Sequence, residues 1–349
     1  PQDATWQNHP YGLKALGDGM YCAGVNWFVF HRFAHQPWLD RKPGMAMGQW
    51  GIQYERTQTW WDFSKPWHEY LARCQLLLQT GRFVADVCYL TTESAFASPP
   101  STGDLDPSLP PGYDYDVIHP RLFMDRMSVS NGWLTLPDGM GYRVLALPPV
   151  RTMTPALLRK LRDLVAGGAT VVGPPPLQSP SLADFPQADH DVQNMAKELW
   201  GDTDGHRVRD HRFGKGRVVW GKPLQEVLAD LGIPPDFEQL APVHGIPLRH
   251  IHRRVGDADI YFVANSNSHP VTAECKFRVT GKAPELWDPE TGRSRAIPAW
   301  RSAGSHTLVP LALGPAGSAF VVFHKPAREA DPVSALHLDG RPRPAADLE

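Results

Sequence analysis

Residues 142–172 constrain the fold more than any other stretch of the chain. An apolar run over residues 142–147 predicts a strand. Thr154 and Pro155 follow as an N-cap and a proline at the first helical position, and a pair of glycines ends the helical pattern. A second apolar run occupies residues 169–172. A strand, a helix and a strand joined by short turns predict two parallel strands, and therefore a parallel α/β sheet.

The same alternation continues on both sides of this unit. We therefore expect a flavodoxin-like parallel α/β domain over residues 82–240. Its further elements are expected as strands at 83–90 and 217–220, a strand or helix start at 114–118, a hairpin at 133–139, and helices at 191–200 and 224–231.

The first 70 residues differ, because they hold seven of the twelve tryptophans. A helical pattern over residues 13–23 precedes an apolar run over residues 25–33, which predicts a buried strand. A long loop and a helix at 60–79 follow. Helix, strand, loop and helix are typical of the last part of a (β/α)8 barrel, whose sites lie at the carboxyl ends of its strands. We expect such a portion of a catalytic barrel over residues 1–81.

Four polar residues follow the predicted strand: His31, Arg32, His35 and Gln36. A zinc site of the HExxH type would need a glutamate where this chain has Arg32, so the histidine pair does not predict zinc and we identify no metal ligands. Either histidine alone could be structural. Together, at the end of a strand, the four residues favour a carbohydrate-binding pocket.

Aromatic residues near this cluster support the same interpretation. The C–H faces of a sugar pack on aromatic rings, and Trp38, Trp50, Trp60 and Trp61 are candidates for such stacking. We take Trp38, Trp60 and Trp61 as substrate-binding candidates beside the polar cluster, and we expect two of the four tryptophans to serve packing only.

Carboxylates give a weaker pattern. Glycoside hydrolysis usually needs two carboxyl groups that flank the scissile bond. In this region only Asp40 and Glu55 lie in the loop, and neither is marked by its neighbours as an acid or a base. The sequence therefore predicts a sugar pocket without an evident catalytic pair.

The C-terminal region predicts a different fold class. Short apolar runs alternate with polar residues between 245 and 325, as in residues 274–279, and turn sequences separate them. This pattern is typical of a β-sandwich, which we expect over residues 241–326, followed by a flexible tail at 327–349. Trp287 and Trp300 could bind glycans if exposed, or pack within the sandwich.

Composition and motifs exclude several classes of function. There are 35 Lys and Arg against 37 Asp and Glu, a net charge of -2, so no large nucleic-acid footprint is expected. No apolar run reaches the ~18 residues of a membrane span. The four cysteines form no CxxC pair. Residues 214–216 lack the rest of a phosphate loop, and no nucleophile elbow follows the strand at 169–172.

Several stretches together resemble glycoside hydrolase family 106, the α-L-rhamnosidase family. They are GVNWFVFHRFAHQPW at 24–38, RTQTWW at 56–61, PELWDP at 284–289 and GSAFVVF at 317–323. The resemblance extends from about residue 5 to 325 and implies the end of a barrel, then a flavodoxin-like domain, then a β-sandwich.

The resemblance also implies an activity. Enzymes of this family are inverting, usually calcium-dependent glycosidases that act on α-L-rhamnose in polysaccharides, so the expected partner is a rhamnose-containing oligo- or polysaccharide. The resemblance places the catalytic carboxylates before Pro1 and carries over only His31, Arg32, His35, Gln36 and Trp38 as lining residues.

The start of the chain adds two expectations. The chain begins with Pro1 and shows no signal peptide, whereas the resemblance suggests a periplasmic or secreted protein. We expect the polypeptide alone to be inactive, with its first 80 residues poorly ordered in the absence of the remaining barrel. The alternative is a non-catalytic carbohydrate-binding or scaffold protein. The oligomeric state is not predicted.

Overall fold

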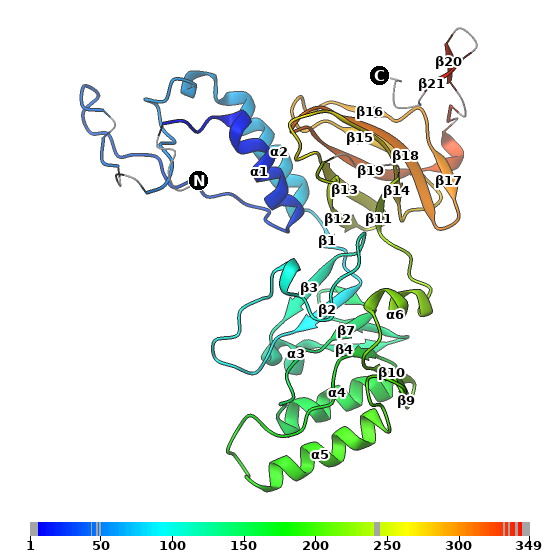
Figure 1. Ribbon diagram of the computed structural model, residues 1–349. Coiled ribbons are helices and arrows are strands. Elements are labelled where there is room, and N and C mark those ends of the chain that lie inside the picture. Colours follow the sequence, from blue (N-terminus) through cyan, green and yellow to red (C-terminus); the bar gives the residue numbers. More distant parts are fainter. Residues whose placement is uncertain are drawn as a thin grey trace. The chain divides into compact units, whose positions relative to one another are not determined.

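The computed structural model describes residues 6–42, 44–46, 48, 50–240, 245–330, 332–333, 336–338 and 341–343. The chain forms two compact units (Figure 1). One is the continuous segment Val84–Asp236, and the other combines Pro1–Phe83 with Phe237–Glu349. Among the described residues, no helix is both long and apolar enough to cross a membrane.

The continuous unit contains a six-stranded sheet in the order β3-β2-β7-β8-β10-β9. All neighbouring pairs are parallel except β9, which pairs antiparallel with β10 at one edge. Its strands are β2 (Val87–Leu90), β3 (Tyr115–Ile118), β7 (Val144–Ala146), β8 (Thr170–Val172), β9 (Asp210–Phe213) and β10 (Gly216–Val219). Its helices are α3 (Pro120–Arg126), α4 (Pro155–Gly167), α5 (Gln187–Trp200) and α6 (Leu224–Asp230).

Helices explain why these strands are apolar on both faces. Val87, Val144 and Val219 contribute to a core shared with Leu224 and Val227 of α6. The residues that alternate with them in the strands are equally buried, and α4 contacts β10. A small sheet of β4 (Ser128–Ser130), β5 (Trp133–Thr135) and β6 (Gly141–Tyr142) completes the unit. A mixed α/β arrangement with a parallel sheet is thereby confirmed.

The second unit is built on two antiparallel sheets. The larger has the order β1-β12-β13-β19-β15-β16, and the smaller has the order β11-β14-β18-β17. The larger sheet contains β1 (Arg82–Phe83), β12 (Arg249–Val255), β13 (Ala258–Ala264), β15 (Lys282–Trp287), β16 (Ser294–Ala296) and β19 (Ser318–Pro326). The smaller contains β11 (Phe237–Leu240), β14 (Val271–Phe277), β17 (Arg301–Ala303) and β18 (His306–Leu313).

The central strands of the larger sheet are buried on both faces. In β13, Tyr261 and Val263 share a core with the smaller sheet, whereas Ile260 and Phe262 belong to a separate core on the opposite face. Since successive strand residues point to opposite faces, only a nearly continuous apolar run satisfies both cores. By contrast, β14 of the smaller sheet alternates buried and half-buried residues over most of its length, because only one face of that sheet is covered.

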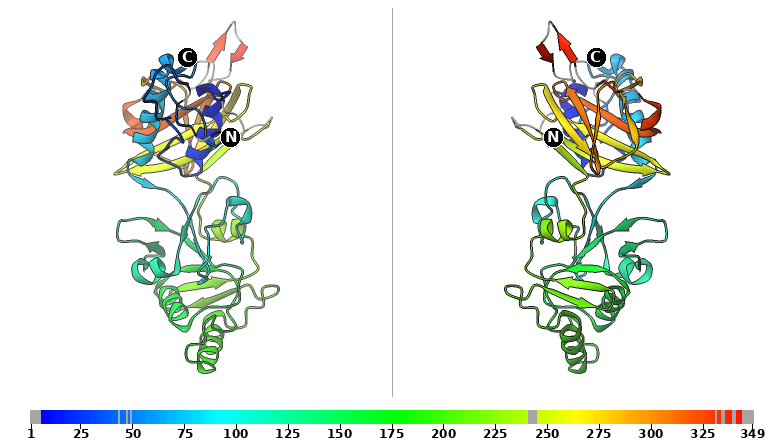
Figure 2. Two further views of the ribbon diagram at one scale, coloured as in Figure 1. Left: turned by 90° about the vertical axis from the view of Figure 1, so that its left-hand side faces the viewer. Right: turned by 90° about the vertical axis from the view of Figure 1, so that its right-hand side faces the viewer.

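Two helices from the start of the chain form the second core. They are α1 (Pro10–Cys22) and α2 (Lys65–Gln79), the latter preceded by a 3-10 turn at Trp61–Phe63. Tyr21 of α1 and Tyr70 of α2 belong to this core together with Phe262 and Phe320 of the sheet. The two helices accordingly pack on β12, β13 and β19 of the larger sheet, and they lie next to the antiparallel sheets in both views of Figure 2. Residues 6–83 are thus part of the β-rich unit, not a body of their own.

One sequence prediction is wrong in this region. Residues 25–33 form no strand, and no described residues pair with them in a ladder. Phe28 and Phe30 pack against the second core, whereas Trp27 and Val29 are 64% and 86% exposed. The alternation is that of a strand, but a strand also needs a neighbour to accept and donate backbone hydrogen bonds. The apolar pattern of residues 25–33 therefore predicted more burial of these side chains than the structure shows.

Other predictions differ in detail. The expected strand at 83–90 is divided between β1, which pairs with β12, and β2 of the parallel sheet. The helix expected at 60–79 begins at Lys65. Strands are present along the region 245–325 where the alternating pattern predicted them, and β11 at Phe237–Leu240 begins before that region. About half of the expected tail at 327–349 falls outside the described residues; within them lie a 3-10 turn at Ala327–Glu329 and the pair β20 (Leu336–Leu338) and β21 (Arg341–Arg343).

Candidate functional site

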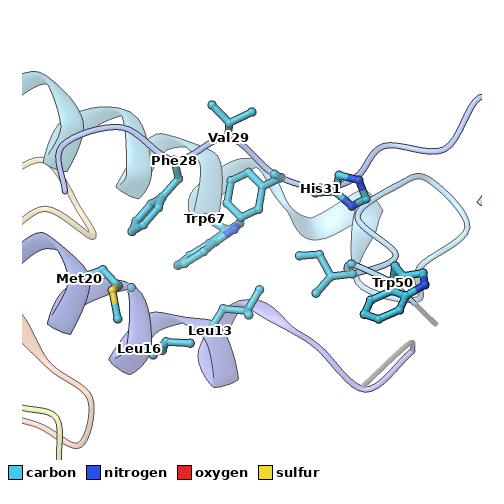
Figure 3. Close-up of a pocket in the computed structure, with 12 residues that line it drawn as sticks. Leu13, Leu16, Met20, Phe28, Val29, His31, Trp50 and Trp67 are labelled. Carbon is cyan, nitrogen blue, oxygen red and sulfur yellow. The ribbon is translucent and has the colours of Figure 1, made fainter. Parts of the chain in front are cut away.

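Helix α1 and the segment that follows it enclose a hollow of about 370 Å3 (Figure 3). Leu13, Leu16 and Met20 line it from α1, where their spacing places them on one face of the helix. Figure 3 shows Phe28 and Val29 on the opposite side. The hollow is therefore lined mainly by aliphatic and aromatic carbon.

At one end of the hollow the lining side chains contain ring nitrogen atoms. His31 and Trp50 both lie at that end (Figure 3), and Trp50 is 57% exposed. Paired backbone hydrogen bonds hold this end, since Ile52 N donates to His31 O at 2.8 Å and Arg32 N donates to Ile52 O at 3.0 Å. Gly51 is required here, because a Cβ at this position would lie 2.4 Å from His31 Nδ1. Among the described residues that line the hollow, His31 is the one titratable side chain.

A second polar group surrounds Glu55, which is fully buried. Gln36 Nε2 donates to Glu55 Oε2 at 2.8 Å and Thr57 N donates to the same oxygen at 2.6 Å, while Thr57 Oγ1 donates to Oε1. Arg56 Nε then donates to Gln36 Oε1 at 2.6 Å. Both carboxylate oxygens are thus engaged and the amide of Gln36 has a fixed orientation. This arrangement suits positioning of the loop better than proton transfer to a sugar.

The structure separates the remaining predicted residues. His35 and Trp38 are exposed, and the Arg41 guanidinium lies 5.8 Å from the Trp38 ring centroid. Arg32 is half-buried, with a buried Nε that has no hydrogen-bond partner. Asp40, the other carboxylate candidate, is exposed. Of the four polar residues predicted at 31–36, His31 lines the hollow together with the stacking candidate Trp50, and Gln36 joins the Glu55 group.

The two adjacent tryptophans serve packing. Trp60 and Trp61 contact the ring of Tyr54 at centroid distances of 5.4 and 5.6 Å, and Trp60 Nε1 donates to Asn8 O at 2.9 Å. Both are half-buried against the second core. Trp38 and Trp50 are the exposed members of the four candidates, at 63% and 57%.

Tyr54 organises this region, and the sequence did not single it out. Its ring stacks on Phe30 at 4.1 Å, and its hydroxyl lies 2.7 Å from His68 Nε2 and accepts from Trp67 Nε1 at 2.9 Å. Burial raises the pKa of Tyr54 to about 12, against the lowering effect of the Trp67 hydrogen bond. The tyrosine is therefore neutral at physiological pH and acts as a hydrogen-bonding centre.

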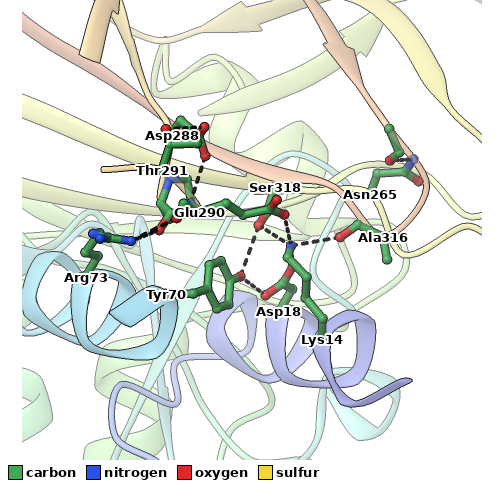
Figure 4. Close-up of polar contacts among 12 residues, drawn as sticks. Lys14, Asp18, Tyr70, Arg73, Asn265, Asp288, Glu290, Thr291, Ala316 and Ser318 are labelled. Carbon is green, nitrogen blue, oxygen red and sulfur yellow. Dashed lines mark hydrogen bonds and ion pairs between the residues drawn. The ribbon is translucent and has the colours of Figure 1, made fainter. Parts of the chain in front are cut away.

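A buried network fixes α1 and α2 to the sheet (Figure 4). Lys14 Nζ donates to Asp18 Oδ2 at 2.8 Å, to Ala316 O at 2.8 Å and to Ser318 Oγ at 2.9 Å. Tyr70 donates to Asp18 Oδ1 and lies 3.1 Å from Ser318 Oγ. A buried ion pair needs such additional partners to offset its desolvation. The α1 side of the hollow is thereby anchored to β19.

The family model described as alpha-L-rhamnosidase, glycoside hydrolase family 106, matches residues 2–301. This chain belongs to that family. A solved rhamnosidase from Novosphingobium sp. PP1Y is 35% identical and superposes with a TM-score of 0.86, covering 97% of this chain and 32% of that one. A protein of Formosa agariphila described as a candidate beta-glucuronidase is 36% identical over 96% of this chain and 27% of its own length.

More distant structures share only the fold. A beta-galactosidase from Bacillus circulans sp. alkalophilus is 12% identical with a TM-score of 0.53, covering 92% of this chain and 54% of the other. The chain thus spans about a third or less of the family relatives that it matches at 35–36% identity. Membership of the α-L-rhamnosidase family makes it part of the glycoside hydrolases.

The calcium implied by the resemblance does not fit the residues described. Within the described ranges, no three His, Cys, Asp or Glu side chains are grouped so that they could hold a metal ion. The oxygens of the buried Glu55 carboxylate already accept from Gln36 and Thr57. We therefore assign no step of a reaction to a metal in this part of the family fold.

Proposed function

We propose that this chain works as a C-terminal portion of a longer α-L-rhamnosidase that removes rhamnose from glycans with inversion. The observation that carries the proposal is the hollow between α1 and residues 28–31 with His31 and Trp50 at one end. Rhamnose is a 6-deoxy sugar, so it has a methyl group where most hexoses have a hydroxymethyl. An apolar lining suits that methyl group, and an indole suits the C–H face of the ring.

The residues of this chain would bind and position the sugar. His31 would donate to or accept from a ring hydroxyl, and Trp50 would pack on the sugar face. Gln36 and Arg56, fixed by Glu55, would hold the neighbouring loop in place. Inversion needs an acid and a base about 6.5–9.5 Å apart, which we place in another part of the longer protein, together with any calcium.

The same proposal includes a finer assignment of the fold. The portion of a (β/α)8 barrel expected over residues 1–81 remains part of this proposal. The parallel sheet of the unit Val84–Asp236, with its antiparallel edge strand, supports a flavodoxin-like domain. The shared core of the two antiparallel sheets supports a β-sandwich.

Hydrolysis of aryl glycosides tests the activity. The longer protein and this 349-residue chain would each be incubated with 4-nitrophenyl α-L-rhamnopyranoside, and NMR would identify the first anomer released. We expect turnover by the longer protein only, with the β-anomer formed first. Rhamnoside hydrolysis by this chain alone would overturn the division of roles, and release of the α-anomer first would overturn inversion.

The name of the Formosa agariphila relative motivates a second substrate in the same assay. With 4-nitrophenyl β-D-glucuronide, we expect no turnover above that of the buffer. Cleavage of the glucuronide and not of the rhamnoside would replace the proposed substrate. Binding of glycans without cleavage of either substrate by the longer protein would favour the non-catalytic alternative.

A further inference from the structure

A separate cleft of about 270 Å3 lies between α2 and the larger sheet, beside the turn that joins β15 and β16. One wall is a face of α2, because Arg73, Leu76 and Leu77 are three or four residues apart in the helix. Leu77 packs on the second core, whereas Leu76 is 68% exposed. The cleft therefore begins where the apolar contact between α2 and the sheet ends.

The floor of the cleft is a row of residues across three strands. Trp287 of β15 is paired with Phe320 of β19 on one side and with Ser294 of β16 on the other. Directly paired residues of antiparallel strands point to the same face, so all three face α2. Phe320 is fully buried, Trp287 is half-buried and Ser294 is exposed. An indole ring and a hydroxyl are therefore neighbours at the open side of the cleft.

The polar edge of Trp287 is already engaged. Its Nε1 donates to Glu285 Oε2 at 3.0 Å. The same oxygen lies 2.8 Å from His324 Nε2, and Lys325 donates to Oε1. The indole therefore has a fixed orientation, and what it can offer to a ligand is the apolar face of its ring. Ser294 differs, because its hydroxyl makes no hydrogen bond within the described part of the chain.

The turn at the end of the cleft is ordered without any ligand (Figure 4). Arg73 Nη1 donates to Pro289 O at 3.1 Å and to Glu290 O at 2.9 Å, which ties α2 to the turn. Asp288 accepts from Glu290 N at 2.8 Å and from Thr291 Oγ1 at 2.6 Å. A site that is already formed loses little conformational freedom when it binds, which favours affinity.

The charges at the cleft cancel. Arg73 lines it and pairs with Glu69 at 3.2 Å. The other charged lining residues among those described are Asp288 and Arg293, which are opposite in sign. A charged ligand would therefore find no excess of counter-charge, and a purely apolar ligand would leave the Ser294 hydroxyl unused. A neutral sugar has both a C–H face for the indole and hydroxyl groups for the serine.

From this arrangement we propose that the cleft is a second carbohydrate-binding site, distinct from the hollow at His31, which takes one neutral sugar ring of a glycan. The C–H face of the sugar packs on Trp287, and Ser294 exchanges hydrogen bonds with its hydroxyl groups. The cleft is smaller than the ~300–1,000 Å3 of pockets for drug-sized ligands, which suits a single ring. The site serves binding, because Asp288 at its edge has both oxygens engaged within the turn. It does not depend on rhamnosidase activity.

Fluorine NMR locates the binding. A chain labelled with 5-fluorotryptophan has twelve tryptophan residues to observe, and Trp287→Phe and Trp50→Phe identify the signals of the two sites. Methyl α-L-rhamnopyranoside, methyl β-D-galactopyranoside and methyl α-D-glucopyranoside would be titrated to tens of millimolar, with D-glucuronate as the charged comparison. We expect at least one neutral glycoside to shift the Trp287 signal to saturation.

Three results would overturn the proposal. No shift of the Trp287 signal with any neutral glycoside would show that the cleft takes no sugar. A shift of the Trp50 signal alone would place all binding in the hollow at His31. Tighter binding of D-glucuronate than of every neutral glycoside would contradict a neutral ligand.

Matched variants test the role of the hydroxyl. Ser294→Ala should raise Kd about threefold to tenfold, as the loss of one hydrogen bond does, without changing the melting temperature. Ser302→Ala removes an exposed serine of the edge strand β17, outside the cleft, and should leave Kd unchanged. Equal changes of Kd in the two variants would contradict a defined site.

The apolar wall needs its own variant. Leu76→Ala shortens the side chain that faces the cleft from α2, and because Leu76 is mostly exposed the melting temperature should change little. We expect a several-fold rise in Kd. Leu122→Ala truncates an exposed leucine of α3 in the other unit and should leave Kd unchanged. An unchanged Kd in Leu76→Ala would show that the sugar does not lie in this cleft.

Discussion

Two regions of the β-rich unit differ in how many of their large apolar side chains are exposed to solvent. Among the described residues between 6 and 63, twelve large hydrophobic side chains are exposed, including Trp27, Val29 and Trp50. Between residues 245 and 330 there are two, Ile246 and Val255. The two regions share a core, so the difference does not arise from poor packing of the first region as a whole.

The difference follows from where the apolar side chains of each region find packing partners. Every central strand of the larger sheet has neighbouring strands within the chain and apolar layers on both faces. Residues 25–33 have a core on one side and solvent on the other. Contiguous exposed apolar surface marks an interaction site, and the family relatives are about three times longer than this chain.

The strongest test compares Phe262→Ala with Val29→Ala. Phe262 is fully buried and packs on Phe320 at 4.9 Å, so its truncation should lower the free energy of unfolding by about 3–5 kcal/mol. Val29 is exposed, and its truncation should change that free energy by less than about 0.5 kcal/mol. Urea denaturation followed by circular dichroism measures both. A similar loss for the two variants would mean that Val29 is covered in solution.

A nearly equal effect is expected at the anchor of α1. Asp18→Asn removes the buried counter-ion of the Lys14 ammonium and leaves only the exposed Glu290 at 3.5 Å, which should cost about 3 kcal/mol in urea denaturation. Lys65→Ala removes a pair with Glu69 at 3.9 Å in which the lysine side chain is 84% exposed, and should cost less than about 0.5 kcal/mol. If both variants lose little, the network does not hold the helix.

The two units should respond oppositely to pH. Burial raises the pKa of Asp114 to about 8, so the native unit Val84–Asp236 keeps a proton that the unfolded chain loses above about pH 4. Its stability therefore falls as pH rises from about 4 to 8 and then levels off.

In the other unit, hydrogen bonds from Lys325, Trp287 and His324 outweigh burial and lower the pKa of Glu285 to about 2. That contribution is complete above about pH 5 and is lost as pH falls towards 2. Hydrogen exchange at pH 5.5 and 8, corrected for intrinsic rates, should show weakening at pH 8 in the unit Val84–Asp236 only. Asp114→Asn should remove most of that weakening, and an unchanged pH dependence would rule out Asp114 as its source.

The smallest effect on stability is expected at His35. His35 is exposed, so His35→Ala in the longer enzyme should leave the melting temperature within about 1 °C. We expect kcat/KM for the aryl rhamnoside to fall about tenfold if the imidazole positions the sugar. Parallel losses of melting temperature and activity would instead make His35 structural. Lys42→Ala is the matched exposed control in the same loop.

The sequence predicted elements whose determinants are local. Thr154 caps α4 by accepting from Leu157 N at 3.3 Å, as its position before a proline indicated. The apolar runs of β13 and β19 likewise predicted strands, because their length and composition suit burial on both faces. The choice of Gln36 also identified a residue that the structure places in a polar cluster.

Features that depend on distant residues could not be predicted in this way. Lys14 and Ser318 are 304 positions apart, and nothing near either residue indicates the other. The alternating pattern at 25–33 is that of a strand. Whether these residues form a ladder depends on a neighbouring strand, and the pattern gives no information about one. Nothing near Trp61 in the sequence indicates that its ring contacts Tyr54 and His68, whereas Trp50 is exposed.

The discontinuous β-rich unit has a consequence for biosynthesis. Helices α1 and α2 are complete by Gln79, yet β19, onto which they pack, ends only at Pro326. At about 5–20 residues per second, translation of the intervening segment takes on the order of ten seconds or more. During that interval the apolar faces of the nascent helices have no sheet to cover them, while the unit Val84–Asp236 can already fold as it emerges. The N-terminal helices are therefore the part of this protein that most needs a holding chaperone at the ribosome.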